Sequence, residues 1–447
     1  MSLTHRVRLG LLALVALCAC SPAPDNAHDR AVSSGGTGLG TGSSGSRGLD
    51  GGGSSGAMAS GAVSSSGTSG AGASGSGAAG VENSISAGEG GLADAAGSGG
   101  AAGAGVDPDG QFLFTHETFG GNGRSCITCH TTETGTISAA QVQALYSTNP
   151  NDPLFRSIDS DDGAGNSYTL LQRRATIRVT VPLPAGVKLV SNPDATSITL
   201  RRGVPTTINT PALDPHLMWD GREPTLISQA RGAILGHAQA TITPTMTQLQ
   251  LITEHEQGPT FFSNDVLRKY AAGGPAPTWP VGSTDSEKRG RRWFVEDSAA
   301  SRFNICGQCH GGPMTNEIQP NAGFVTGSHF QTVSVSEFNL ANNPTYEFSF
   351  PVPNDAGKTL TVTTPDPGQA LVTGDYNDLN SFKIPPLWGV KNTAPYFHDN
   401  SAATLEDLMA AYRKHMSTFL PATGSYPNPY VPTDRDSADI IAYMKLL

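Results

Sequence analysis

The sequence predicts a mainly α-helical fold of two domains with long loops and one small β insertion. The 447 residues include 54 glycines and 31 prolines, and only 15% are charged, a composition typical of a loop-rich protein. Two helix-like segments, 111–119 and 284–296, each precede a copy of the same cysteine motif. One stretch, at about 175–200, alternates between apolar and polar residues with the period of a β-strand.

The charge of the chain argues against one class of partner. The formal net charge is −10 at pH 7, with 28 basic and 38 acidic residues. No segment carries the basic stripe that binds phosphate backbones, so we expect no nucleic-acid partner. The net charge allows electrostatic steering of a basic partner cytochrome, but the sequence does not decide whether one binds.

Residues 1–20 predict a signal peptide of the lipoprotein type. Arg6 and Arg8 supply the positive start, residues 10–17 form a short apolar core, and Leu17-Cys18-Ala19-Cys20 resembles a site of cleavage and lipid attachment. An ordinary secretory signal with incidental cysteines is the alternative. Either one predicts a protein of the periplasm or cell envelope. A lipid would be its only membrane contact, because no later apolar run approaches the ~18 residues of a spanning helix.

Residues 21–106 predict a disordered tether. They consist mainly of Ser, Gly, Ala and Thr and contain hardly any aromatic residue. Such a segment cannot bury enough apolar surface to offset the entropy lost on ordering. We expect it to act as a flexible Gly/Ser linker between the anchor and the folded part.

The four cysteines after the signal peptide form two copies of one motif. They are Cys126-Ile-Thr-Cys129-His130 and Cys306-Gly-Gln-Cys309-His310. Cys-x-x-Cys-His is the attachment signature of c-type haem, because two thiols one turn apart each bond a vinyl group and the adjacent imidazole binds the iron. A thioredoxin-like motif or two local disulfides would not need a histidine after each pair, and a shared zinc site needs pairs much closer in sequence. We therefore expect two covalently bound haems, with His130 and His310 as iron ligands.

The motifs define two cytochrome-c-like domains, 107–275 and 284–447, on either side of a Pro- and Gly-rich boundary at 272–280. A further helix is expected at 225–235. The β insertion lies in the first domain, with short strands predicted at 176–181, 187–190 and 197–200. It is either surface decoration or part of a substrate-binding region.

Two further segments resemble a known family. Met218-Trp-Asp-Gly-Arg222 between the motifs, and residues 382–405 with their Thr-Ala-Pro-Tyr-Phe-His run, are similar to the bacterial dihaem cytochrome c peroxidases and their MauG-like relatives. The resemblance covers roughly residues 110–447. It implies that hydrogen peroxide is reduced at the His130 haem. Electrons would enter at the His310 haem from a small redox protein, such as a cytochrome c or a cupredoxin.

The resemblance also implies a side chain that relays electrons between the two haems, and it leaves other functions of the protein open. Trp219 matches a tryptophan that lies between the two haems of the family, although a core aromatic residue is the alternative. A MauG-like oxidase or oxygenase acting on an organic or protein substrate is the second hypothesis. A dihaem electron carrier without enzymatic activity is the third.

Axial ligands would decide which iron reacts. No histidine lies between His130 and His216, so the usual distal histidine of the family peroxidases is absent and the first haem is expected to be five-coordinate. For the second haem, the resemblance places a ligand on the helix after Thr404. Tyr412 is the favoured candidate and Met416, one turn later, is the alternative, with His415 beside it.

The resemblance implies a distal glutamine and glutamate at the first haem. The glutamine matches Gln229, but the glutamate position holds Gln239, which cannot exchange protons at ordinary pH. The nearby His237 is the predicted replacement in acid–base catalysis, with a structural histidine as the alternative.

The resemblance further implies a calcium ion between the two domains, and the sequence leaves open whether this chain binds it. The calcium would be held partly by backbone carbonyls at Thr393 and Pro395. An asparagine expected in the same site is replaced by Gly203, so one side-chain ligand is missing.

Overall fold

The computed structural model describes residues 109–295, 304–320, 325–335, 343–353, 355, 357–419 and 430–447. The predicted signal peptide and tether lie outside these residues. No helix in the described part is long and apolar enough to cross a membrane.

The helices of the first half begin where the sequence places capping side chains. Thr225 accepts from the backbone N–H of Ser228, and Thr245 accepts from that of Gln248. The helix predicted at 225–235 is confirmed, and the first predicted helix ends earlier than expected, at Thr115. The helical segments of this half are α2 (Gly110–Thr115), η1 (Cys126–Thr128), α3 (Ala139–Thr148), η2 (Ser157–Asp159), α4 (Thr169–Arg174), α5 (Thr210–Leu213), α6 (Leu226–Gly236), α7 (Met246–Glu256), η3 (Pro259–Phe261) and α8 (Asp265–Ala271).

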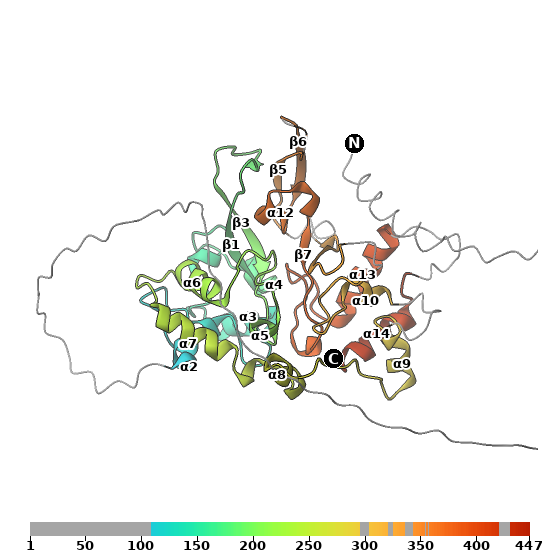
Figure 1. Cartoon of the computed structure of the whole chain (residues 1–447). Coiled ribbons are helices and arrows are strands. Elements are labelled where there is room, and N and C mark those ends of the chain that lie inside the picture. The colour runs from blue at the N-terminus through green and yellow to red at the C-terminus, as the bar shows by residue number, and fades with distance from the viewer. Residues whose placement is uncertain are drawn as a thin grey trace, which may run out of the picture. The chain divides into compact units, whose positions relative to one another are not determined.

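The second half opens with the predicted capping box, in which Thr284 and Glu287 bond each other's backbone N–H. A second box, Thr433 with Asp436, starts the last helix. The helical segments of this half are α9 (Asp285–Arg291), α10 (Ile305–Cys309), α12 (Ala370–Thr373), η4 (Tyr376–Asp378), η5 (Val390–Asn392), α13 (Leu405–Phe419) and α14 (Asp434–Met444). The prediction of a mainly helical fold is confirmed (Figure 1).

Each half contains a close helix crossing that requires a glycine. A Cβ on Gly110 of α2 would lie 2.0 Å from the carbonyl oxygen of Leu251 in α7. A Cβ on Gly290 of α9 would lie 2.0 Å from the carbonyl oxygen of Asp439 in α14. Any larger residue would push the helices apart, so the two glycines permit the same crossing twice.

The strands are distributed more widely than the sequence predicts. The predicted insertion is present as β1 (Thr176–Pro182), β2 (Lys188–Leu189) and β3 (Ser197–Gly203), with β1 and β3 antiparallel. However, β2 pairs with β5 (Tyr346–Pro351), which continues into β6 (Thr359–Thr364) in the second half. A third sheet joins β4 (Phe330–Thr332) to β7 (Ser381–Lys383).

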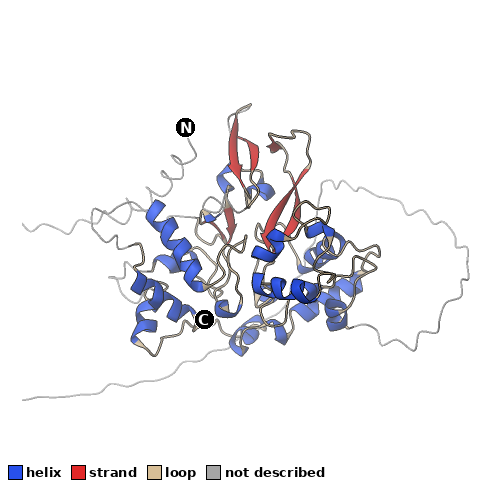
Figure 2. Ribbon diagram, turned by 180° about the vertical axis from the view of Figure 1, so that it is seen from behind, coloured by secondary structure: helices blue, strands red, loops and turns tan. Residues whose placement is uncertain are grey.

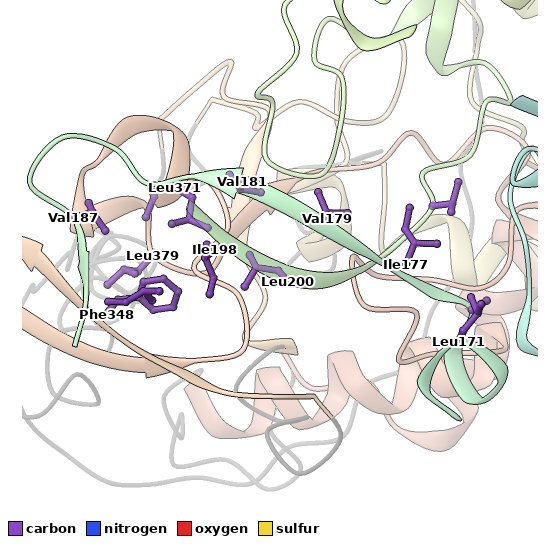
Figure 3. Packing of buried hydrophobic residues seen from close by; sticks show 14 of the residues in the cluster. Leu171, Ile177, Val179, Val181, Val187, Ile198, Leu200, Phe348, Leu371 and Leu379 are labelled. Atoms are coloured by element: carbon purple, nitrogen blue, oxygen red, sulfur yellow. The ribbon is translucent and has the colours of Figure 1, made fainter. Parts of the chain in front are cut away.

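The insertion predicted at about 175–200 in the first domain therefore pairs, through β2, with a hairpin of the second half. Figure 2 shows the strands between helices of the two halves. Val181, Ile198 and Leu200 of the first half share one buried cluster with Phe348 and Leu371 of the second (Figure 3). Two residues of β2 cannot show a strand period, so their pairing with a distant hairpin leaves no signal in the local sequence.

Candidate haem sites

The first motif is held in a short 3-10 turn. The residues of η1 include Cys126, and the backbone N–H of His130 donates to the Cys126 carbonyl at 3.0 Å. The Nδ1 atom of His130 lies 2.8 Å from the carbonyl oxygen of Gly135. Since a carbonyl only accepts, Nδ1 donates its proton and Nε2 keeps a lone pair for a metal.

The second motif repeats this geometry on one turn of α-helix. The backbone N–H of His310 donates to the Cys306 carbonyl at 2.9 Å, and Nδ1 of His310 lies 2.9 Å from the carbonyl oxygen of Thr315. In both motifs the accepting carbonyl belongs to the fifth residue after the histidine. Each imidazole is thus oriented as an iron-binding histidine requires.

The turn of α10 packs tightly against the chain that precedes it. The backbone N–H groups of Cys306 and Gly307 donate to the carbonyl of Trp293 at 2.9 and 3.1 Å. A Cβ on Gly307 would lie 1.9 Å from the carbonyl oxygen of Phe294. A glycine between the two cysteines is therefore needed for this close approach.

The cysteines are suited to thioether bonds rather than to a thiolate metal site. All four thiols are free, and burial raises the pKa of Cys129 and Cys309 to about 11 and that of Cys306 to about 12. Burial also raises the pKa of Cys126. These groups stay protonated at neutral pH, unlike the thiolates of a zinc site.

A cavity of about 920 Å³ opens beside the second motif. Its size falls within the range of roughly 300–1,000 Å³ that cofactor pockets occupy in proteins. Its wall includes Cys306, Cys309 and His310, so a porphyrin bonded to these residues fits here. The apolar part of the wall is supplied by Phe294, Leu387, Trp388, Leu408, Met409, Ile440 and Met444.

The structure brings both candidate ligands of the second haem, and the neighbouring His415, to this cavity. Tyr412, His415 and Met416 line it from α13. Burial raises the pKa of Tyr412, whose ring lies 5.8 Å from that of Phe397. Burial lowers the pKa of His415 to about 4, so this imidazole is neutral at pH 7. The choice between Tyr412 and Met416 remains a prediction.

His237 lies near the first motif, as its sequence position predicts. It caps α6, and its backbone carbonyl accepts from Nδ2 of Asn122 at 2.9 Å and from a guanidinium nitrogen of Arg124 at 3.4 Å. Its charge contributes to the lowered pKa of His130, which places the two imidazoles close together. Burial lowers the pKa of His237 itself, and its Nδ1 has no hydrogen-bond partner among the described residues.

The two glutamines of the predicted distal site are placed differently. Gln229 is half-buried on α6, eight residues before His237. Gln239 is exposed, and its Oε1 accepts from Nδ2 of Asn122 at 3.0 Å. The roles of Gln229, Gln239 and His237 in catalysis remain predictions.

A buried ion pair and a buried glutamate near the first motif were not predicted from the sequence. Arg124 donates to Asp159 at 2.6 Å, and both side chains are almost fully buried. Glu256 ends α7 and is 5% exposed, and its charge contributes to the raised pKa of Cys126. Burial raises the pKa of Glu256 to about 8, and its Oε2 has no partner among the described residues. Glu256 lies on the same face of α7 as the buried Leu249 and Ile252, and this helical spacing was the signal that could have indicated its burial.

Trp219 lies where the two halves meet. Its Nε1 donates to the Gly203 carbonyl at 2.8 Å, and its ring lines the cavity of the second motif. Next to it, the buried Arg202 of β3 bonds Asp220 at 2.5 Å and Asp366 of the second half at 2.7 Å. The predicted relay role of Trp219 is not tested by this contact.

The predicted calcium site has an altered side-chain position. A Cβ on Gly203 would lie 2.1 Å from Oδ1 of Asn400, so the Asn400 amide occupies the space of a residue-203 side chain. Calcium would therefore depend on the backbone carbonyls at Thr393 and Pro395. Within the described ranges, no three His, Cys, Asp or Glu side chains form a metal-binding group. Calcium remains a prediction.

The chain resembles two known cytochrome c peroxidases over part of its length. No protein-family model matches the chain. A cytochrome c551 peroxidase of Nitrosomonas europaea is 26% identical over 216 residues, which are 45% of this chain and 55% of that protein. Cytochrome-c peroxidase IdrP1 of Denitromonas iodatirespirans is 32% identical over 82 residues, which are 18% of this chain and 22% of the relative. The chain thus spans about half of the first relative and about a fifth of the second.

Two solved structures share low identity with the chain. One is a MauG-like protein associated with microbial copper homeostasis, with a TM-score of 0.42, 18% identity, and coverage of 76% of this chain and 86% of that one. The other is the diheme peroxidase BthA from Burkholderia thailandensis, with a TM-score of 0.37, 16% identity, and coverage of 75% and 84%. The predicted resemblance to bacterial cytochrome c peroxidases is confirmed by the similarity of the chain to the two peroxidase relatives.

Proposed function

We propose that this chain is a dihaem c-type cytochrome peroxidase that reduces hydrogen peroxide at the first motif with electrons from an external donor. The observation that carries the proposal is the matched orientation of His130 and His310, each tied by Nδ1 to the fifth following carbonyl. When bound, a haem with one open axial side supplies an iron that can react with peroxide. The cytochrome c peroxidase relatives support the same reaction class.

The chain's own residues would manage the protons at the first site. Peroxide must lose a proton from one oxygen and gain one on the other before its bond breaks. His237 is held near His130 by the bonds of its carbonyl to Asn122 and Arg124, and its lowered pKa keeps it neutral and able to accept that proton. Gln229, on the same helix, would orient the substrate by hydrogen bonding.

The second site would receive the electrons. Its cavity is enclosed mainly by apolar side chains, and α13 presents Tyr412 and Met416 as possible ligands. His310 together with Tyr412 or Met416 would hold the iron of a haem bound here, and that haem would supply electron-transfer chemistry. Trp219, which lines the cavity from the first half, would relay them toward the first motif.

A MauG-like oxidase or oxygenase is the second candidate. Tyr412 in the cavity wall and the lack of a histidine between His130 and His216 both favour it. The third candidate, a dihaem electron carrier, would require a second protein ligand on both irons.

Spectroscopy of the purified, haem-loaded protein separates these functions. We expect a high-spin ferric signal from the first haem and steady oxidation of a reduced small cytochrome c when peroxide is added. A protein with only low-spin haem would be an electron carrier. High-spin haem without donor oxidation, together with consumption of an organic or protein substrate, would establish the oxidase.

The location follows from the predicted signal peptide. We propose a protein of the periplasm or cell envelope, anchored by a lipid on Cys20 and held away from the membrane by the tether 21–106. Mass spectrometry of the membrane-extracted protein should show a lipidated N-terminus. An unmodified N-terminus in a soluble extract would establish an ordinary secretory signal.

A further inference from the structure

Two tryptophans lead from the second haem cavity toward the protein surface. Trp388 lines the cavity, is 7% exposed, and donates from Nε1 to the Pro313 carbonyl at 2.9 Å. Trp279 is half-buried, and its ring centre lies 6.1 Å from that of Trp388.

Neighbouring aromatic residues hold Trp279 in this position. Its ring stacks on Tyr443 at 6.5 Å with an angle of 15° between the planes. The Tyr443 hydroxyl donates to the carbonyl of Pro280, the residue after Trp279, at 2.9 Å. Phe294 lies 6.0 Å from Trp279 and also lines the cavity. The boundary segment 272–280 thus places an indole at a fixed distance from the cavity wall.

Indole is among the side chains most readily oxidised by one electron, whereas phenylalanine is not oxidised under the same conditions. An electron moves through a protein faster in two short steps between such groups than in one long step. The ring centres of Trp388 and Trp279 lie 6.1 Å apart, so the step between these two side chains is short. Since Trp279 is the more exposed of the two, it is the end that a soluble partner could reach.

We propose that Trp388 and Trp279 form an electron path between the second haem pocket and the surface, and that a small reduced redox protein delivers electrons at Trp279. This path rests on the proposed peroxidase function. Reduction of one peroxide to two waters takes two electrons and two protons. For each electron, Trp388 gives one electron inward, Trp279 refills Trp388, and the donor protein refills Trp279 and is oxidised. No bond of either indole forms or breaks.

Without a donor, the same path predicts damage at its outer end. Trp279 would lose two electrons to one peroxide and gain one oxygen atom from water, so the net products are oxygenated tryptophan and water. Peptide mass spectrometry of the haem-loaded protein after peroxide treatment should find this oxygen on Trp279. In a Trp388→Phe variant, oxygenation of Trp279 should fall at least about tenfold, which corresponds to about 1.4 kcal/mol in barrier.

The donor reaction gives a second, independent readout. Trp279→Phe should slow peroxide-driven oxidation of a reduced small cytochrome c at least about tenfold. Trp279→Tyr should restore most of the rate, because phenol is also oxidisable. Trp293→Phe is the matched control, since Trp293 is 4% exposed in the same cluster but does not line the cavity. It should leave the rate unchanged.

Two results would overturn the path. One is an unchanged donor rate in Trp279→Phe, and the other is oxygenation confined to other residues in the wild type. Either result leaves the peroxidase function standing if wild-type protein still consumes peroxide with the donor. If the haem-loaded wild type consumes no peroxide with any donor, the proposed function itself fails.

Discussion

The two haem-attachment segments are built alike, yet their surroundings differ. In each, a glycine at a helix crossing, Gly110 or Gly290, precedes the first cysteine by sixteen residues. A phenylalanine follows that glycine by four residues, and it packs against an aromatic ring of the crossing helix: Phe114 against His255 at 5.4 Å, and Phe294 against Tyr443 at 5.5 Å. The local sequence of each segment thus specifies a haem-attachment site.

The surroundings that determine reactivity come from other parts of the chain. The first motif has His237 and the Arg124–Asp159 pair nearby, all of them polar. The second motif has a largely apolar cavity with Tyr412 on α13. The carbonyl groups that face the two crossing glycines belong to Leu251 and Asp439. Five residues after them lie Glu256 in the first half and Met444 in the second, and both side chains are buried. Covalent attachment is therefore a local property, whereas the function of each haem depends on distant helices.

Removal of one attachment site at a time tests this division most directly. Cys306→Ala with Cys309→Ala should leave one haem that still changes its spectrum with peroxide but accepts no electrons from a donor. Cys126→Ala with Cys129→Ala should leave one haem that does not react with peroxide. Haem content is measured by pyridine haemochrome absorbance and intact mass. The reverse pattern would show that the roles of the two sites are exchanged.

Loss of His237 should have the next largest effect. General acid–base groups contribute roughly 10²–10⁴-fold to rate, so His237→Ala should lower peroxide turnover by at least about 100-fold. Because burial lowers the pKa of His237, wild-type turnover should fall with acidification only below the ordinary histidine value of 6.5. Gln239→Ala is the control, because this exposed side chain should matter little. Equal rates for His237→Ala and wild type would assign His237 a structural role.

Much of the fold could be predicted from the sequence because its signals are local. The motifs, the capping box at Thr284 and the strands of β1 and β3 each depend on residues within one turn or one hairpin. The repeated Gly, Phe and Cys spacing was also present in the sequence, although a comparison of the two halves was needed to find it. Its physical meaning, a backbone contact at 2.0 Å, becomes evident only in three dimensions.

The structural features that were not predicted from the sequence depend on contacts between residues that are distant in the chain. The pairing of β2 with β5 joins residues about 160 positions apart, and neither strand encodes its partner. Arg202 follows Ile198 and Leu200 on the buried face of β3, but the strand does not indicate its partners Asp220 and Asp366, which lie elsewhere in the sequence. Glu256 lies on the same face of α7 as the buried Leu249 and Ile252, so its spacing indicates burial, but the lack of a partner for its Oε2 among the described residues becomes evident only in three dimensions.

Glu256 should make the stability of the protein depend on pH in the alkaline range. Its folded pKa, about 8, is raised above the ordinary 4.5, so the folded state binds its proton more tightly. Stability from this group is therefore complete below pH 4.5 and is lost as the pH rises through about 8. At about 1.4 kcal/mol per pKa unit, the change amounts to a few kcal/mol.

Glu256→Gln should remove this dependence and stabilise the protein at alkaline pH, as measured by denaturant unfolding at pH 5 and pH 9. Glu254→Gln, a neighbouring residue of α7 that is exposed, is the matched control and should follow the wild type. A parallel loss of stability in wild type and Glu256→Gln would show that other groups titrate instead.

The smallest expected effect concerns the identity of the ligand at the second haem. A phenolate ligand would lower the haem potential, whereas a thioether ligand would raise it. If Tyr412 binds the iron, Tyr412→Phe should raise the midpoint potential by on the order of 0.1 V, a fraction of the roughly 0.8 V over which axial ligands set haem potentials. Met416→Leu should then leave the potential and the visible spectrum unchanged. Potentiometry of both variants decides the matter, because a shift in Met416→Leu alone would identify Met416 as the ligand. The first haem should keep its spectrum in both cases, since α13 supplies the wall of the second cavity.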